Sequence, residues 1–154
     1  MGGWSILSFK DLSIDMKTFE VLDHTADIGI VAWGNSLSEV FAHAAQGMFF
    51  LIADKQCDQY SFETTVAIDG NDYEDLLVTW LNELLYIFDV EQAFLCDFEI
   101  TEIGQYFLKA QIRGELFNSI KLPIKHVVKA CTYYEAKVEE QKPELWRAQV
   151  YFDI

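Results

Sequence analysis

Two segments with the apolar spacing of a helix, residues 36–54 and 70–91, lie in the middle of this sequence and constrain its fold most. Each places apolar side chains three or four positions apart, so that they share one face of a helix. The face of the first segment contains Leu37, Val40, Phe41, Ala44, Met48 and Ile52. The face of the second contains Leu77, Trp80, Leu81, Leu84 and Phe88. Each helix therefore needs a partner surface that covers a wide apolar face.

Both segments begin with residues that favour a helix start. Ser36 and Glu39 fit a capping box, in which each side chain satisfies the free backbone N–H of the other residue. Asn71 or Asp72 can cap the second helix, and the acidic residues of its first turn suit the positive end of the helix dipole. These local signals predict where both helices begin.

Strand patterns flank the two helices on both sides. They cover about 18–23, 28–33, 60–69, 94–104, 105–116, 126–140 and 146–154, with a hairpin turn at Gly104-Gln105. With helices in the middle and strands at both ends, the order predicts an α+β fold, a largely antiparallel sheet packed with two main helices. A chain of 154 residues suits one domain. We expect residues 1–16 to be an N-terminal extension and residues 17–154 to form the domain.

The charge balance limits the classes of partner. Asp and Glu outnumber Lys and Arg 25 to 11, for a formal net charge of −14. Affinity for nucleic-acid backbones comes mainly from Lys and Arg, so direct RNA or DNA binding is disfavoured. Basic proteins or cations are favoured instead. No apolar run reaches the roughly eighteen residues of a membrane-spanning helix, so we expect a soluble, cytoplasmic protein without a membrane partner.

The three cysteines, Cys57, Cys96 and Cys131, form no CxxC pair and are odd in number. This pattern predicts free thiols in a reducing compartment. A nucleophilic role for Cys131 is a weaker alternative, since the sequence identifies no base for it. HExxH motifs, glycine-rich phosphate loops and spaced Cys/His sets are absent from the sequence.

The junction of the first two expected strands, within "FEVLDHTADIGIVAWG", is unusually polar. Asp23 suits a turn, because its side chain can hydrogen-bond the nearby backbone. Asp27 is less easily explained, because Ile28 begins the next strand. A carboxylate at a strand entrance, such as that of Asp27, is a candidate cation ligand. His24 is the histidine in this junction.

The last strand pattern, "AQVYFDI", runs to the end of the sequence. If this strand lies in a sheet, it holds the side chain of Asp153 and the terminal carboxylate of Ile154 close together. Adjacent carboxylates repel unless they are protonated, solvated or neutralised by a cation. Oxygen ligands suit Ca²⁺ or Mg²⁺, whereas a solvated carboxylate pair is the alternative. An acid–base pair of Asp27 with Asp153 is a further possibility.

Basic and histidine residues offer fewer indications. Lys121, Lys125, His126 and Lys129 form one basic patch, for which a solvated strand face is the simplest explanation. Lys129 lies within an expected strand, so its side chain has a defined direction and could meet a carboxylate. His43 lies among apolar residues of the first helix and is expected to be partly buried and hydrogen-bonded.

Five segments in series carry a family resemblance across about residues 17–154. They are "FEVLDHTADIGIVAWG", "LSEVFAHAAQGMFFLI", "DLLVTWLNELLYIFD", "IKHVVKACTYYEAKV" and "WRAQVYFDI". The chain resembles the archease family in the order and spacing of these segments and in the Asp-Ile at its end. It differs at Cys131, where many members have valine.

The resemblance implies a fold similar to the main domain of a redox-regulated heat-shock chaperone. It also implies a protein cofactor of a GTP-dependent RNA ligase, which joins 2′,3′-cyclic-phosphate or 3′-phosphate ends to 5′-hydroxyl ends. Such a cofactor promotes guanylylation of the ligase's histidine and multiple turnover in tRNA splicing or RNA repair, and is not itself an enzyme.

Residue by residue, the resemblance assigns metal binding to Asp27, Asp153 and Ile154. The expected cation is a divalent metal, Ca²⁺, with Mg²⁺ or Mn²⁺ as alternatives. It assigns partner activation to Lys129, together with Asp27 and Asp153. His24 and Asp23 would support this geometry. Two alternatives stay open: a chaperone-like protein-binding module and a metal-dependent hydrolase that uses the same carboxylates.

Overall fold

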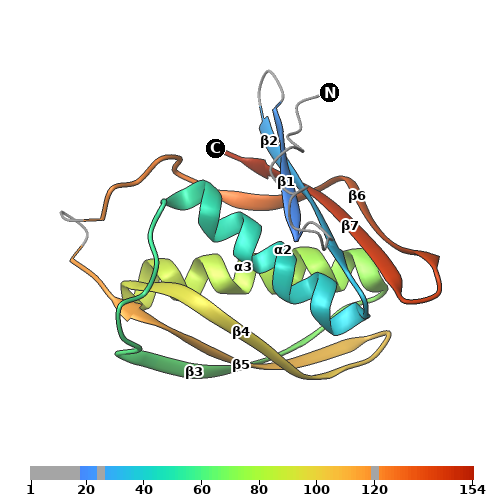
Figure 1. Cartoon of the computed structure of the whole chain (residues 1–154), viewed down its shortest axis with the longest axis horizontal. Helices are drawn as coiled ribbons and strands as arrows, with labels where there is room; N and C mark the ends of the chain where they lie inside the picture. The colour runs from blue at the N-terminus through green and yellow to red at the C-terminus, as the bar shows by residue number, and fades with distance from the viewer. Residues whose placement is uncertain (1–17, 24–26, 119–121) are drawn as a thin grey trace.

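A computed structural model describes residues 18–23, 27–118 and 122–154. In this part of the chain, two helices lie between two antiparallel sheets, as Figure 1 shows. The helices are α2 (Leu37–Ile52) and α3 (Tyr73–Glu91). One sheet has the order β1 (Phe19–Asp23), β2 (Asp27–Gly34), β7 (Leu145–Asp153), β6 (Ala130–Lys142). The other has the order β3 (Phe62–Asp69), β5 (Phe107–Leu116), β4 (Ala93–Ile103).

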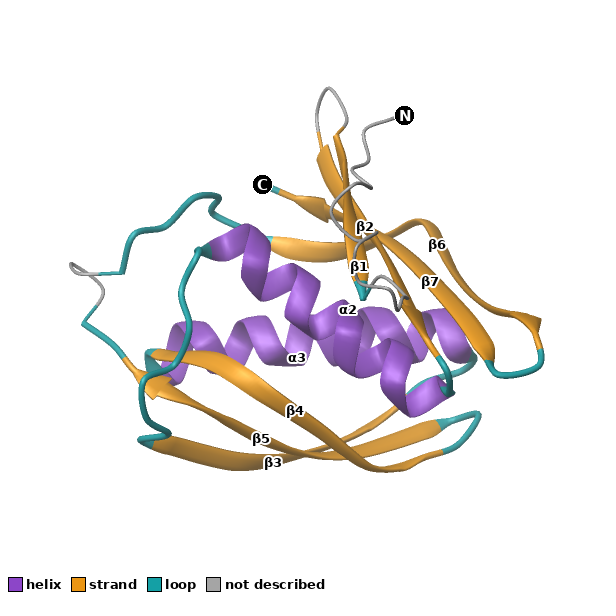
Figure 2. Cartoon of the chain, viewed as in Figure 1, coloured by secondary structure: helices purple, strands orange, loops and turns teal. Residues whose placement is uncertain are grey.

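The predicted α+β class is confirmed, but the strands are divided differently from the expectation of one sheet. Coloured by secondary structure, Figure 2 shows the helices as a middle layer with a sheet on each side. Helix α2 packs against β2 of one sheet and β4 of the other. Its buried residues therefore extend around more of the helix than one face, and include Ala45, Phe49 and Leu51. A helix enclosed by apolar surface on two sides is expected to be apolar nearly all round.

Both helix starts agree with the sequence prediction. The Ser36 hydroxyl accepts a hydrogen bond from the backbone N–H of Glu39 at 3.1 Å. The Glu39 carboxylate accepts from the N–H of Asn35, one residue earlier than the expected capping box. Asp72 caps α3, where its carboxylate accepts from the N–H of Asp75 at 2.8 Å.

Large apolar side chains between the layers form the core. Trp80 of α3 is fully buried, and its indole N–H donates to the carbonyl oxygen of Phe41 in α2 at 3.0 Å. This bond gives the one polar atom of the buried ring a partner, which an indole in a core requires. His43, also on α2, is half-buried, and its Nδ1 bonds the carbonyl oxygen of Trp33 in β2. The expectation of a hydrogen-bonded, partly buried histidine is thus confirmed.

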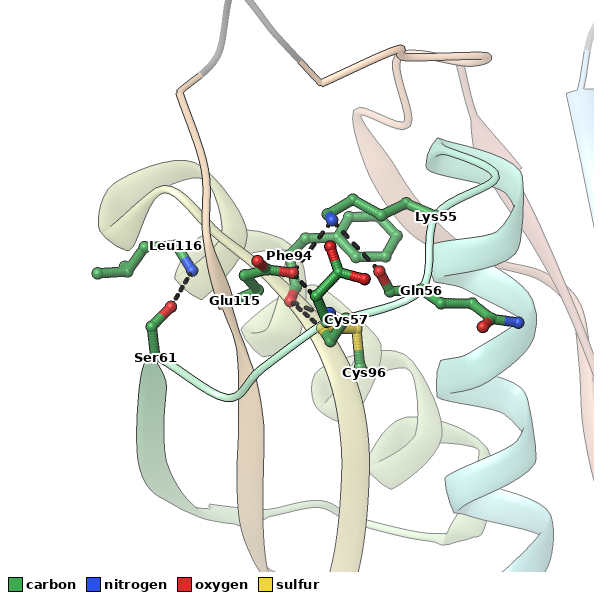
Figure 3. Close-up of polar contacts among 9 residues, drawn as sticks. Lys55, Gln56, Cys57, Ser61, Phe94, Cys96, Glu115 and Leu116 are labelled. Carbon is green, nitrogen blue, oxygen red and sulfur yellow. Dashed lines mark hydrogen bonds and ion pairs between the residues drawn. A yellow bond between two sulfur atoms is a disulfide. The ribbon is translucent and has the colours of Figure 1, made fainter.

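The expectation of three free thiols is wrong for two of them. Cys57 follows α2 and forms a disulfide with Cys96 of β4, across 39 positions of sequence (Figure 3). Nothing in the spacing of these cysteines indicates the pairing, because a contact between the two segments exists only in the folded chain. The loop after α2 is also held to β5 by two hydrogen bonds. The Lys55 ammonium and the backbone N–H of Asp58 both donate to the carboxylate of Glu115.

The third cysteine fits a structural role. Cys131 is 4% exposed, and burial raises the pKa of its thiol well above the ordinary value. A buried, protonated thiol is a poor nucleophile, so the weaker alternative of a reactive Cys131 has no support here.

Among the described residues, neither helix is both long and apolar enough to cross a membrane.

Candidate functional site

The structure places the two predicted acidic residues directly opposite each other. Strands β2 and β7 run antiparallel, and their register pairs Asp27 with Asp153. Side chains of directly opposed residues project from the same face of a sheet, with Cβ atoms about 4.5–5.5 Å apart. The side chains of two residues far apart in the sequence therefore project from the same face at one end of the sheet.

Burial of the neighbouring residues explains why both carboxylates face outward. Ile28 and Phe152, each one position further into its strand, are 7% and 0% exposed and belong to the core. Because successive side chains of a strand alternate between faces, Asp27 and Asp153 project from the face opposite the core. Asp153 is exposed and Asp27 is half-buried. Like charges directly opposite each other destabilise a sheet, so this pair favours a cation or a basic group between them.

Strand β6 brings a third chain segment to the same place. Ala130 pairs with Asp153, and the N–H of Lys129 donates to the carbonyl oxygen of Asp153 at 2.7 Å. Lys129 lies just before β6, not within a strand as the sequence analysis expected, and its side chain is exposed. Ile154 follows β7 and is 37% exposed. We call this group of residues, Asp27, Lys129, Asp153 and Ile154, the tip.

Main-chain contacts with α2 fix the segment that leads into the tip. The N–H of Lys125 donates to the carbonyl oxygen of Ile52 at 2.7 Å, and Ile124 forms an isolated bridge with Ala53. The Lys125 ammonium also lies 3.8 Å from the centroid of the Phe50 ring. Part of the predicted basic patch is thus engaged with α2. Lys121 lies outside the described residues.

The structure says less about Asp23 and His24, the two residues expected to support the geometry of the site. Asp23 ends β1, and its backbone pairs with Ile28. His24 lies outside the described residues, so its predicted role stays a prediction. In the described ranges, no three His, Cys, Asp or Glu side chains are grouped to hold a metal ion. A cation at the tip would therefore depend on two side-chain carboxylates and the terminal carboxylate of Ile154.

Asn82 of α3 is a residue that the sequence analysis missed. Its amide N–H donates to the carbonyl oxygen of Cys131 at 3.0 Å, and its amide oxygen accepts from the N–H of Cys131 at 2.8 Å. The available signal was its position, because Asn82 interrupts the apolar run "TWLNELL". A polar side chain within such a run needs hydrogen-bond partners.

A cavity of about 570 Å³ lies away from the tip. It is bounded by α2, the loop after it and β4, and aromatic residues such as Phe49 and Phe98 line it together with the disulfide. No residue of the tip contributes to its lining. The tip is thus an exposed surface site, separate from this cavity.

Together these features define a class of protein: a small α+β protein with two helices between two antiparallel sheets, and an acidic tip where β2, β6 and β7 meet. The family model of the Archease protein family matches residues 19–154. The chain belongs to this family.

Individual relatives agree with the family match. A "Protein archease" from Methanosarcina acetivorans is 41% identical over 144 residues, which are 90% of this chain and 97% of that protein. Another from Pyrococcus abyssi is 40% identical over 90% of this chain and 100% of that protein. The solution structure of Methanobacterium thermoautotrophicum protein 1598 matches with a TM-score of 0.77 and 34% identity. That match covers 90% of this chain and 100% of that chain.

Proposed function

We propose that this protein is a non-enzymatic cofactor that activates a GTP-dependent RNA ligase in the cytoplasm. The ligase would join 2′,3′-cyclic-phosphate or 3′-phosphate ends to 5′-hydroxyl ends in tRNA splicing or RNA repair. The cofactor would promote guanylylation of the ligase's histidine and repeated turnover. Family membership and one structural observation support this proposal: the register that sets Asp27 opposite Asp153, whose carbonyl oxygen accepts from the main chain of Lys129.

The chemistry of the tip suits a role at another protein's nucleotide site. It presents oxygen ligands and one lysine on an exposed edge, instead of a closed pocket with a nucleophile and a base. With a formal net charge of −14, the protein would be repelled by RNA phosphates and would reach them only through its partner.

A divalent cation fits the donor set of the tip. Asp27, Asp153 and the terminal carboxylate of Ile154 supply only oxygen atoms, which suits a hard cation such as Ca²⁺, with Mg²⁺ or Mn²⁺ as alternatives. When bound, the cation would neutralise the opposed carboxylates and offer a positive charge to phosphate oxygens. The protein itself would fix the ligands on two strands and leave the outer side of the cation open.

The proposal is tested by single-turnover guanylylation of a purified RNA ligase with GTP, with and without this protein. We expect the protein to raise the rate of guanylylation and the number of ligated ends per ligase. An equal excess of an unrelated acidic protein serves as control for charge. No stimulation, or phosphate-ester hydrolysis by this protein alone, would contradict the proposal. Suppressed aggregation of unrelated clients without ligase stimulation would favour a chaperone-like module instead.

Cation binding is a separate prediction. Titration calorimetry with Ca²⁺ is expected to show one site on the wild-type protein. The double variant Asp27→Asn/Asp153→Asn keeps the shape of both side chains but removes both charges, so we expect its affinity to fall by roughly tenfold or more. Equal affinity of the variant and the wild type would exclude the tip as the cation site.

A further inference from the structure

The side chain of Asn82 forms hydrogen bonds with the main chain of β6, in the way that the backbone of a neighbouring strand would. Its side-chain amide donates to the carbonyl oxygen of Cys131 and accepts from the N–H of the same residue. Strand β6 is the last strand of its sheet among residues 18–23, 27–118 and 122–154, so in this part of the chain these two groups lie on an edge without a neighbouring strand. The primary amide of Asn carries N–H donors and an oxygen acceptor on one planar group, so it can bond the N–H and the carbonyl oxygen of one strand residue at the same time.

The part of β6 that Asn82 holds is short. Residues Ala130, Cys131 and Thr132 pair with the end of β7, and the register is then interrupted until Lys137. Glu135 lies within the interruption with a left-handed φ of 49°. The first three residues of β6 are thus separated from the remainder of the strand by an irregular stretch.

Helix α3 contacts β6 at other points, but these lie further along the strand. The Tyr133 hydroxyl donates to the Asp75 carboxylate at 2.6 Å, and the N–H of Val138 donates to the Glu74 carboxylate at 2.9 Å. The Tyr133 bond is the main cause that lowers the pKa of Asp75. Of the hydrogen bonds that Asn82, Asp75 and Glu74 of α3 make with β6, those of Asn82 therefore lie closest to the tip along the strand.

A short path of main-chain contacts leads from Asn82 to the tip. Cys131 is two residues from Lys129, whose N–H donates to the carbonyl oxygen of Asp153. Ala130, between them, pairs with Asp153, which itself pairs with Asp27. A shift of Cys131 would move the main chain of Lys129, and with it the end of β7 at Asp153.

We propose that Asn82 is a positioning residue, which fixes the start of β6 and with it the main chain of Lys129 against Asp153, when the protein acts on its RNA ligase. This inference rests on the proposed function for its activity. Asn82 acts through the main chain of Cys131 and contacts neither cation nor ligase.

The experiment compares Asn82→Ala with a matched control, Glu74→Ala. Both variants remove a side-chain-to-main-chain contact between α3 and β6, but Glu74 acts beyond the irregular stretch. At saturating concentration, we expect Asn82→Ala to stimulate ligase guanylylation about fivefold less than wild type, and Glu74→Ala to stimulate fully. A purely structural role would lower both in proportion to their loss of thermal stability.

Two further measurements separate positioning from stability. In a Lys129→Ala background, adding Asn82→Ala should lower stimulation no further, because the positioned group is already absent. Amide hydrogen exchange, which needs no ligase, should be about tenfold faster at Lys129 and Cys131 in Asn82→Ala, and unchanged there in Glu74→Ala. If Asn82→Ala does not fold, Asn82→Asp replaces it, since the aspartate keeps an acceptor for the N–H of Cys131 and loses the donor.

Unchanged exchange at Lys129, full stimulation by Asn82→Ala, or an additive loss in the double variant would each overturn the inference. If the wild-type protein does not stimulate the ligase at all, the proposed function fails. The exchange data then decide alone whether Asn82 fixes Lys129.

Discussion

Asp27→Asn and Asp153→Asn are each expected to lower the stimulated rate of ligase guanylylation by about tenfold or more, toward the rate of the ligase alone. Each substitution keeps the size of the side chain and the backbone pairing of β2 with β7. What it removes is one of two opposed charges, and with it a proposed ligand for a cation. The measurement is the single-turnover rate with GTP over a range of concentrations of this protein.

Stability provides the internal check for these two variants. Removing one of two like charges that face each other across strands relieves a repulsion of roughly 0.2–1 kcal/mol. We therefore expect the melting temperature of both variants to be unchanged or slightly higher, so that lost stimulation cannot come from unfolding.

Asp69→Asn is the matched control, because Asp69 is an exposed carboxylate at the end of β3 in the other sheet. It changes the net charge equally and should stimulate like wild type. Equal losses in all three variants would mean that overall charge, not the tip, attracts the ligase.

The helices could be predicted from the sequence because their determinants are local. The caps at Ser36 and Asp72 and the apolar spacing lie within a few residues of one another. The hairpin of β4 and β5 was likewise indicated by the turn residues between them. The division of the strands into two sheets was not predictable in this way, because it depends on which distant strands pair.

The arrangement of the tip could not be predicted from the sequence for the same reason. Asp27 and Asp153 were each unusual in their local context, and a family resemblance suggested that they act together. Their register is a contact between opposite ends of the domain, which only the structure supplies. Asn82 was overlooked because its partner is the main chain of Cys131, and a main-chain partner leaves no mark in the sequence.

Reduction of the Cys57–Cys96 disulfide is expected to lower the free energy of unfolding by about 3–4 kcal/mol. The bond closes a loop across 39 positions, and the chain entropy that it removes from the unfolded state corresponds to about 4 kcal/mol at most. For a chain of this size, the loss corresponds to a fall in melting temperature of roughly 10 °C. Thermal unfolding with and without a dithiol reductant measures it.

The reduced protein should nevertheless keep its native fold. Glu115 still binds Lys55 and the N–H of Asp58, and Ser61 still accepts from the N–H of Leu116 at 2.9 Å. These contacts hold the loop after α2 against β5 without the disulfide. Because none of them reaches the tip, the stimulation of the ligase at a temperature well below unfolding should be the same in both redox states.

Thiol counting and two variants make the disulfide prediction decisive. The unreduced protein, once denatured, should expose one reactive thiol, that of Cys131, and the reduced protein three. Cys57→Ser/Cys96→Ser should melt like reduced wild type and be insensitive to reductant, because it cannot close the loop. Cys131→Ala should keep the full response to reductant. Three reactive thiols before reduction would show that the bond does not form in the purified protein, and the original expectation of free thiols would then hold.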